Sequence, residues 1–265
     1  MKTQEVLCKT ALSRSTLPGL DYSLNPYRGC MHNCAYCYAP NVLRIPRQDW
    51  GQLIEVKKNI PLVLAKEVKT KKPGVVGIST VTDPYQPLEQ RYQLTRFCLE
   101  QLLRYDFPAH IQTKSALVTR DIDLLSRFSD AQVMFSIGTI HDAERRLLEP
   151  WASPIQDRLA ALKKCSEAGL RTAVFFGPVY PTIPKAEIPR ILDTIKNLGA
   201  QELWIDMLRL RPGIWENVEK KLQQNRDILH MFSLHLLEEK SYYKELREEL
   251  QKKAKERNLK IIDAF

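Results

Sequence analysis

The sequence predicts an α/β protein with a parallel sheet, because strand-like and helix-like segments alternate along most of the chain. Alternating units of this kind form parallel sheets with helices outside. The chain has 265 residues, enough for one domain with a buried core, and no internal repeat or low-complexity linker divides it. The pattern leaves two arrangements open, a doubly wound open sheet and a partial barrel.

The predicted strands are short apolar or β-branched runs, at Asp21–Asn25, Val75–Ser79, Ala109–Thr113, Gln132–Gly138, Arg171–Phe176 and Glu202–Leu208. The helices between them are predicted at Ile60–Val68, Gln90–Arg104, Arg120–Phe128, Ile155–Ala168 and Lys185–Leu198. Helix limits follow from local signals: Asn59 and Pro61 mark a helix start, and Gly169 and Gly199 mark helix ends.

Three regions are predicted: an N-terminal arm over residues 1–21, a core over 22–210, and a helical extension over 211–265 packed on the core. The arm has little periodicity. The extension is predicted to hold two helices, Trp215–Leu229 and Phe232–Asn258. Its last residues, Lys260–Phe265, either add a short closing strand or pack beside the sheet.

Composition limits the function. The chain has 40 Lys+Arg and 31 Asp+Glu, a net charge of +9, which favours anionic partners but fits a solvated charged surface equally well. No apolar run is long enough to cross a bilayer and the first residues lack a signal-peptide core, so we expect a cytoplasmic protein that does not bind membranes. Six cysteines in that compartment favour metal or redox chemistry over disulfides.

Three of those cysteines, Cys30, Cys34 and Cys37, form a C-x3-C-x2-C loop. Thiolates are preferred ligands of iron–sulfur clusters and of zinc. A closed zinc site needs a fourth ligand, and no second Cys/His pair follows, although His32 within the loop could serve. A cubane cluster held by three cysteines leaves one iron free to bind another molecule, and this is the more economical interpretation.

The loop, with Tyr36 before its last cysteine, resembles the cluster loop of radical S-adenosylmethionine (SAM) enzymes. The longer run Asn25–Pro40 resembles the spore photoproduct lyase-like branch of that superfamily. Further motifs fall in the order of that branch, within a resemblance that spans roughly residues 8–210: Thr82–Glu89, Gln112–Ser115, Phe135–Thr139, Leu148–Pro150 and Gly177–Pro181.

This resemblance implies a partial (β/α)6 TIM-like barrel and two cofactors, a [4Fe–4S] cluster and SAM. The open iron would bind the amino and carboxylate groups of SAM. Reductive cleavage would then give a 5′-deoxyadenosyl radical that abstracts hydrogen from a substrate. The first candidate substrate is a nucleic acid or nucleotide, and the reaction needs an electron donor such as flavodoxin or ferredoxin. The resemblance implies an enzyme but does not separate a lyase from a transferase.

Ligands of parallel βα folds gather beyond the carboxyl ends of the strands, where this chain places hydroxyls, a lysine and a carboxylate. The resemblance implies that Tyr36, Thr82, Lys114 and Ser136 hold SAM, and Asp83 in the same stretch is a further candidate. A lysine at such a mouth can pair with the SAM carboxylate. Each residue also has a structural alternative: core packing for the tyrosine, solvent exposure for the lysine, and helix caps or turns for the others.

The chain departs from the lyase at one position. The lyase has a cysteine at the end of the second strand that donates hydrogen to the substrate radical, whereas Ile78–Asp83 contains none. Cys98 and Cys165 lie within predicted helices and are expected to be inert, so Cys8 in the arm and Tyr36 are the candidate catalytic residues. Thymine-dimer repair by the lyase's mechanism is therefore in question.

Several alternatives stay open. Glu149 and Arg158 are either a buried pair that ties the fourth loop or a contact to SAM, and Glu89 is expected to be structural. Radical-mediated group transfer from SAM competes with hydrogen abstraction. The positive charge and the tyrosines near the loop also suit a non-enzymatic, metal- or cluster-dependent nucleic-acid-binding module.

Overall fold

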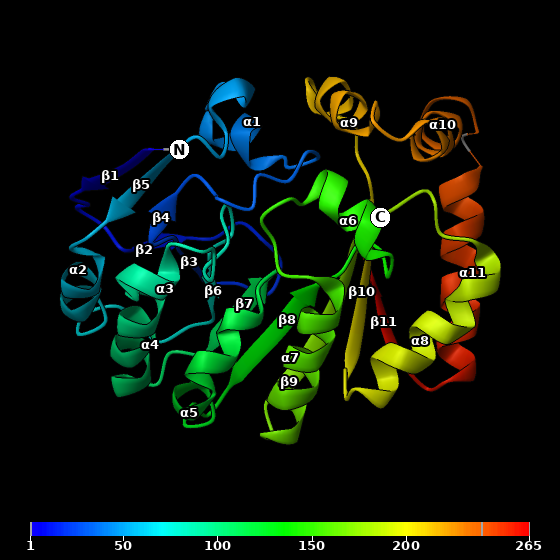
Figure 1. The fold of residues 1–265 in the computed structure, drawn as a ribbon. Coiled ribbons are helices and arrows are strands. Elements are labelled where there is room, and N and C mark those ends of the chain that lie inside the picture. Colours follow the sequence, from blue (N-terminus) through cyan, green and yellow to red (C-terminus); the bar gives the residue numbers. More distant parts are fainter. Residues whose placement is uncertain (1, 240, 265) are drawn as a thin grey trace.

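The computed structural model describes residues 2–239 and 241–264. Its main sheet has eight strands in the order β11-β10-β9-β8-β7-β6-β3-β2, and every neighbouring pair from β3 to β11 is parallel (Figure 1). All six predicted strands are present. The bounds are β2 Leu12–Arg14, β3 Tyr22–Leu24, β6 Val76–Ile78, β7 Ala109–Thr113, β8 Ala131–Ser136, β9 Arg171–Val179, β10 Glu202–Met207 and β11 Lys260–Asp263.

The strand order decides between the two predicted arrangements. A doubly wound sheet reverses its strand order at a switch point, where its ligand binds. Here the six predicted strands follow one another across the sheet in chain order, with β2 and β11 at the two edges. This is the singly wound order of a partial (β/α)6 barrel.

Helices cover the outer face of the sheet (Figure 1). Those between the strands are α2 Ile60–Glu67, α3 Glu89–Tyr92, α4 Leu94–Arg104, α5 Ile122–Leu125, α6 Asp142–Leu148, α7 Ile155–Glu167 and α8 Ile188–Asn197, with short turns η2 Ala116–Asp121 and η3 Lys185–Glu187. The helix predicted at Gln90–Arg104 is broken at Gln93, which has φ 51°. The Glu89 carboxylate accepts the backbone N–H groups of Thr95 and Arg96 and so caps α4, a structural role as expected.

The prediction of two continuous C-terminal helices was wrong, because each of them is interrupted. The first consists of α9 Ile214–Leu222 and α10 Arg226–Ser233, because the Asn225 side chain caps a new helix by accepting the N–H of Ile228. The second is interrupted after a π-helical turn, η4 Leu234–Glu238, and resumes as α11 Tyr242–Glu256. β11 pairs with β10, so the last segment adds a strand; Phe265 lies outside the described residues.

A second, three-stranded sheet was not predicted. β1 Lys2–Val6 pairs with β5 Leu53–Lys57, which pairs with β4 Tyr27–Arg28. Four of the five β1 residues are exposed and polar. Its sequence therefore lacks the alternation of apolar and polar residues from which a strand is predicted. The sheet positions the cysteine loop: a Cβ on Gly29, at φ 89°, would lie 2.6 Å from the Leu53 carbonyl oxygen. After the loop come α1 Ala39–Leu43 and η1 Arg47–Asp49.

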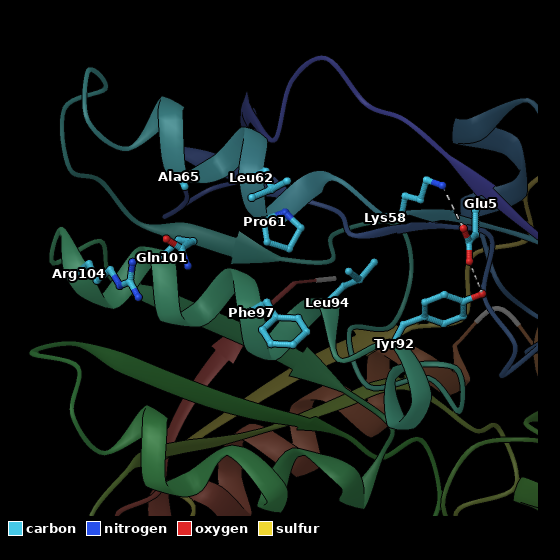
Figure 2. Close-up of a pocket in the computed structure, with 10 residues that line it drawn as sticks. All are labelled: Glu5, Lys58, Pro61, Leu62, Ala65, Tyr92, Leu94, Phe97, Gln101 and Arg104. Atoms are coloured by element: carbon cyan, nitrogen blue, oxygen red, sulfur yellow. Dashed lines mark hydrogen bonds and ion pairs between the residues drawn. The ribbon is translucent and has the colours of Figure 1, made fainter.

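A pocket of about 680 Å³ lies on the outer face between α2 and α4 (Figure 2). Glu5 bridges its rim, with Lys58 and the Tyr92 hydroxyl each 3.3 Å from a carboxylate oxygen. Its lining contains none of the predicted site residues. Among the residues that the structure describes, no helix is both long and apolar enough to cross a membrane.

Candidate functional site

The cysteine loop joins β4 to α1. Cys30 and Cys34 are buried, with 7% of each residue exposed, and Cys37 is partly buried. Two turns shape the loop, since the N–H of Asn33 donates to the Cys30 carbonyl and the N–H of Cys37 donates to the Cys34 carbonyl. Burial, together with the nearby Asp83 and Cys37, raises the pKa of Cys30 to about 12. The three thiols thus lie within one eight-residue loop that is largely buried.

Side chains from the end of β6 hold the loop. The Thr82 hydroxyl donates to the Gly29 carbonyl over 2.6 Å, and the Gln86 amide donates to the same carbonyl over 3.3 Å. The Gln86 side-chain oxygen accepts the N–H of Met31 over 2.9 Å. Thr82, predicted to bind SAM, thus supports the cysteine loop, and any role toward SAM stays a prediction. Gln86, fully buried, was missed although it lies within the motif Thr82–Glu89.

Asp83 joins three parts of the site. Its carboxylate accepts the Thr113 hydroxyl and the Lys114 N–H, both over 2.7 Å, and the Tyr85 N–H over 2.9 Å. His32 of the cysteine loop lies 3.3 Å away through Nδ1. Burial alone would raise the pKa of Asp83, but His32 and these donors lower it to about 2. Asp83 therefore stays ionised and ties the ends of β6 and β7 to the loop.

Tyr36 belongs to a buried network with Glu149 and Arg158, of which the sequence suggested only the Glu149–Arg158 pair. Its hydroxyl donates to the Glu149 carboxylate, which pairs with the Arg158 guanidinium. Arg158 also donates to the carbonyls of Ser136 and Ser153 over 2.9 and 2.8 Å. Glu149 and Arg158 have exposures of 1% and 0%. The pair therefore ties the loop after α6 to the end of β8, and it also reaches the cysteine loop.

Lys114, at the end of β7, lies over Tyr36, with its ammonium 5.8 Å from the ring centroid. Burial lowers the pKa of Lys114, but Cys34 and Glu149 outweigh this and raise it, so the amine stays protonated. Ser136, at the end of β8, is buried and its hydroxyl accepts the Gln112 amide over 3.1 Å. The contacts that Lys114 and Ser136 would make with SAM stay predictions.

The remaining cysteines lie apart from the loop in sequence. The backbone N–H and carbonyl of Cys8 bond to the Asn59 side chain at the start of α2, over 2.8 and 2.9 Å. Burial raises the pKa of the Cys8 thiol. Its role as a hydrogen donor stays a prediction. Cys98 and Cys165 are fully buried, as expected for inert core thiols.

The residues around the three cysteines fit an iron–sulfur cluster. Within residues 2–239 and 241–264, no three His, Cys, Asp or Glu side chains converge to hold a single metal ion. A cluster does not need that convergence, because each thiolate binds a different iron. Lys114 and Arg47 supply positive charge, and Arg47 donates to the Cys37 carbonyl over 3.0 Å. The buried indole N–H of Trp50 has no acceptor among the described residues, and a sulfur of a bound cluster could accept its hydrogen bond.

Three cysteine thiols and a lysine ammonium therefore lie near the carboxyl ends of the strands of a singly wound parallel sheet, where the ligands of such folds bind. The sequence matches the Radical SAM superfamily model over residues 24–195, more than half of the chain. The chain belongs to the radical SAM superfamily. It is an enzyme, and family membership gives SAM and an iron–sulfur cluster as its cofactors.

Relatives span most of the chain. An uncharacterized protein of Methanocaldococcus jannaschii is 32% identical over 185 residues, 69% of this chain and 70% of that protein. An uncharacterized protein of Acidianus two-tailed virus is 30% identical over 80% of this chain and 78% of its own length. A protein of Pseudomonas phage M6 named a radical SAM Nalpha-GlyT isomerase is 28% identical, over 76% of this chain and 43% of that protein.

Solved structures share the fold. A spore photoproduct lyase double mutant with bound AdoMet and dinucleoside spore photoproduct superposes with a TM-score of 0.71 and 17% identity, over 99% of this chain and 82% of that chain. Streptococcus suis SuiB bound to precursor peptide SuiA gives a TM-score of 0.56 and 15% identity, over 92% of this chain and 48% of that chain. At these identities the likeness establishes the fold.

Proposed function

We propose that this enzyme holds a [4Fe–4S] cluster through Cys30, Cys34 and Cys37, cleaves SAM reductively, and abstracts a hydrogen atom from a nucleic acid or nucleotide. The observation that carries the proposal is the position of Lys114. Its ammonium lies over Tyr36, and the neighbouring Cys34 and Glu149 raise its pKa, so that it stays protonated. A cation in this place can pair with the carboxylate of SAM, the group that would also bind the open iron of the cluster.

The roles of the chain's own residues follow from their contacts. When bound and reduced, the cluster supplies the electron that breaks a carbon–sulfur bond of SAM. Lys114 binds the SAM carboxylate. Glu149 accepts the hydrogen bond of the Tyr36 hydroxyl and so fixes the ring over which the Lys114 ammonium lies. Thr82 and Asp83 hold the cysteine loop against the ends of β6 and β7. Tyr36, Asp83 and Glu149 are buried, which favours a site with little access for water.

Three observations support a nucleic acid or nucleotide as the substrate. The net charge is +9. Tyr38, directly after Cys37, is 44% exposed, and the Arg211 guanidinium lies 5.6 Å from its ring centroid. An exposed aromatic ring beside an arginine can stack a base and pair with a phosphate. The structurally similar lyase is described with a dinucleoside photoproduct, and the phage relative is named an isomerase.

The test is anaerobic reconstitution followed by product analysis. We expect about four irons per chain. Reduced enzyme with SAM should release 5′-deoxyadenosine, and deuterium from labelled DNA or nucleotides should enter that product. Cys30→Ala serves as the control that should lose all three signals. A colourless, zinc-loaded protein that cleaves no SAM would contradict the proposal and favour a binding module, and deuterium transfer only from labelled peptides would exclude the nucleic acid substrate.

A further inference from the structure

Trp50 carries a buried hydrogen-bond donor without a partner. Only 4% of the residue is exposed, and its indole Nε1 has no acceptor among the residues that the structure describes. Buried donors in proteins are nearly always paired, so a lone one calls for a ligand that completes it. By contrast, the Nε1 of Trp204 donates to the Glu202 carboxylate over 3.2 Å.

The surroundings of Trp50 indicate what the acceptor is. Trp50 forms a small buried group with Cys30 and Ala39, against which Cys37 and three aliphatic side chains pack. The side-chain atoms of this group that can accept a hydrogen bond are the sulfurs of the two cysteines. Both cysteines are proposed ligands of the cluster, so Trp50 packs in the group of side chains next to which the cluster would be held.

The backbone holds Trp50 firmly against the loop. Its N–H donates to the Arg47 carbonyl over 3.2 Å at the end of η1, and Arg47 in turn bonds to the Cys37 carbonyl. The next residue, Gly51, has φ 76°, and a Cβ there would lie 2.6 Å from the Asn33 side chain between two of the cysteines. The Trp50 segment is therefore packed directly on the cysteine loop.

We propose that the indole N–H of Trp50 donates a hydrogen bond to a sulfur of the bound cluster and raises its reduction potential. A hydrogen bond to sulfur favours the reduced cluster because that state carries more negative charge, and such bonds are an established way to set the potential. The inference rests on the proposed cluster. In this role Trp50 sets the potential of the cluster and takes no part in breaking or forming a bond.

The first experiment places nitrogen-15 in the tryptophan indoles of the reconstituted, reduced wild-type enzyme and records pulsed electron paramagnetic resonance. We expect a nitrogen-15 coupling to the reduced cluster that disappears in Trp50→Phe and persists in Trp204→Phe. The second experiment is a potentiometric titration followed by the same resonance. Trp50→Phe should shift the potential to more negative values, and Trp204→Phe should leave it unchanged.

An absent coupling in the wild type would overturn the inference, as would an unchanged potential in a Trp50→Phe enzyme with full iron content. The coupling is measured on the wild type, so it decides the question even if Trp50→Phe fails to take up iron. Iron content and SAM cleavage of the wild type test the proposed function separately. A wild type with a cluster, SAM cleavage and no indole coupling would refute the role of Trp50 alone, whereas a wild type that takes up no iron would overturn both.

Discussion

The phenol of Tyr36 donates a hydrogen bond to the carboxylate of Glu149, which lies 113 residues further along the chain. Glu149 is in turn paired with the buried guanidinium of Arg158. The aromatic residue before the last cysteine is therefore fixed by the loop after α6 and by α7, so the geometry of the cysteine loop depends on distant parts of the fold.

Removing Glu149 should destabilise the protein strongly, because Arg158 would keep a buried charge without its partner. We expect Glu149→Ala to lower the free energy of unfolding by about 3–5 kcal/mol, measured by urea denaturation under anaerobic conditions. Tyr36→Phe should cost less, about 1.5–3 kcal/mol, for one hydrogen bond to a charged group. The double variant should cost less than the sum, because both changes remove the same bond.

A matched control exists for Tyr36→Phe. Tyr85 is buried like Tyr36, and its hydroxyl also donates to a carboxylate, that of Asp121, over 3.1 Å. Tyr85→Phe should cost similar stability while leaving SAM affinity unchanged, whereas Tyr36→Phe should also weaken SAM binding. Equal SAM affinities in the two variants would show that the Tyr36 bond serves stability alone.

Each of Cys30, Cys34 and Cys37 is expected to be necessary for the cluster. Replacing any one by Ala should abolish the visible absorption of the reconstituted protein and reduce its iron content, because two thiolates hold a cubane poorly. Cys98→Ala is the control, since Cys98 is buried in α4. Full iron content in all three single variants would contradict the assignment of these cysteines as cluster ligands.

Lys114→Ala should weaken SAM binding with the cluster intact. Loss of one charge-assisted bond costs about 1.5–3 kcal/mol, or roughly tenfold to more than a hundredfold in the dissociation constant. Isothermal titration of the reconstituted enzyme measures this, with the exposed Lys163→Ala as control. An unaltered dissociation constant for Lys114→Ala would mean that its ammonium does not contact SAM.

SAM should be consumed during turnover, with 5′-deoxyadenosine accumulating alongside product. The stretch Ile78–Asp83 has no cysteine to donate hydrogen to a product radical, and recovery of hydrogen from 5′-deoxyadenosine is uphill for most carbon radicals. Following SAM and 5′-deoxyadenosine together, with dimer-containing DNA among the substrates, tests this. Efficient dimer reversal with SAM regenerated, also in Cys8→Ala, would refute it.

Much of the fold was predictable from local signals. The six central strands are short apolar runs between turns, and Gly169 and Gly199 end helices where expected, both with positive φ. Breaks within helices were harder to predict. The predicted helix is interrupted at Gln93. The Glu89 carboxylate, which is held by Arg120 and Tyr27, accepts a backbone N–H from the first turn of α4 and so starts a new helix there. β1 was missed because its exposed polar residues carry no alternation.

The sequence by itself determined the family, the cysteine loop and the six central strands with the helical segments between them, because these depend on residue spacing and on nearby residues. The residue pattern left the winding of the sheet open, and the strand order confirms the partial barrel that the family resemblance implied. Only the tertiary structure decided that Gln86 supports the loop and that Tyr36, Glu149 and Arg158 form one network. It alone showed that Trp50, whose indole N–H is unpaired, is buried in one group with Cys30. These relationships join residues far apart along the chain, and no local pattern encodes a contact that exists only after the sheet has formed.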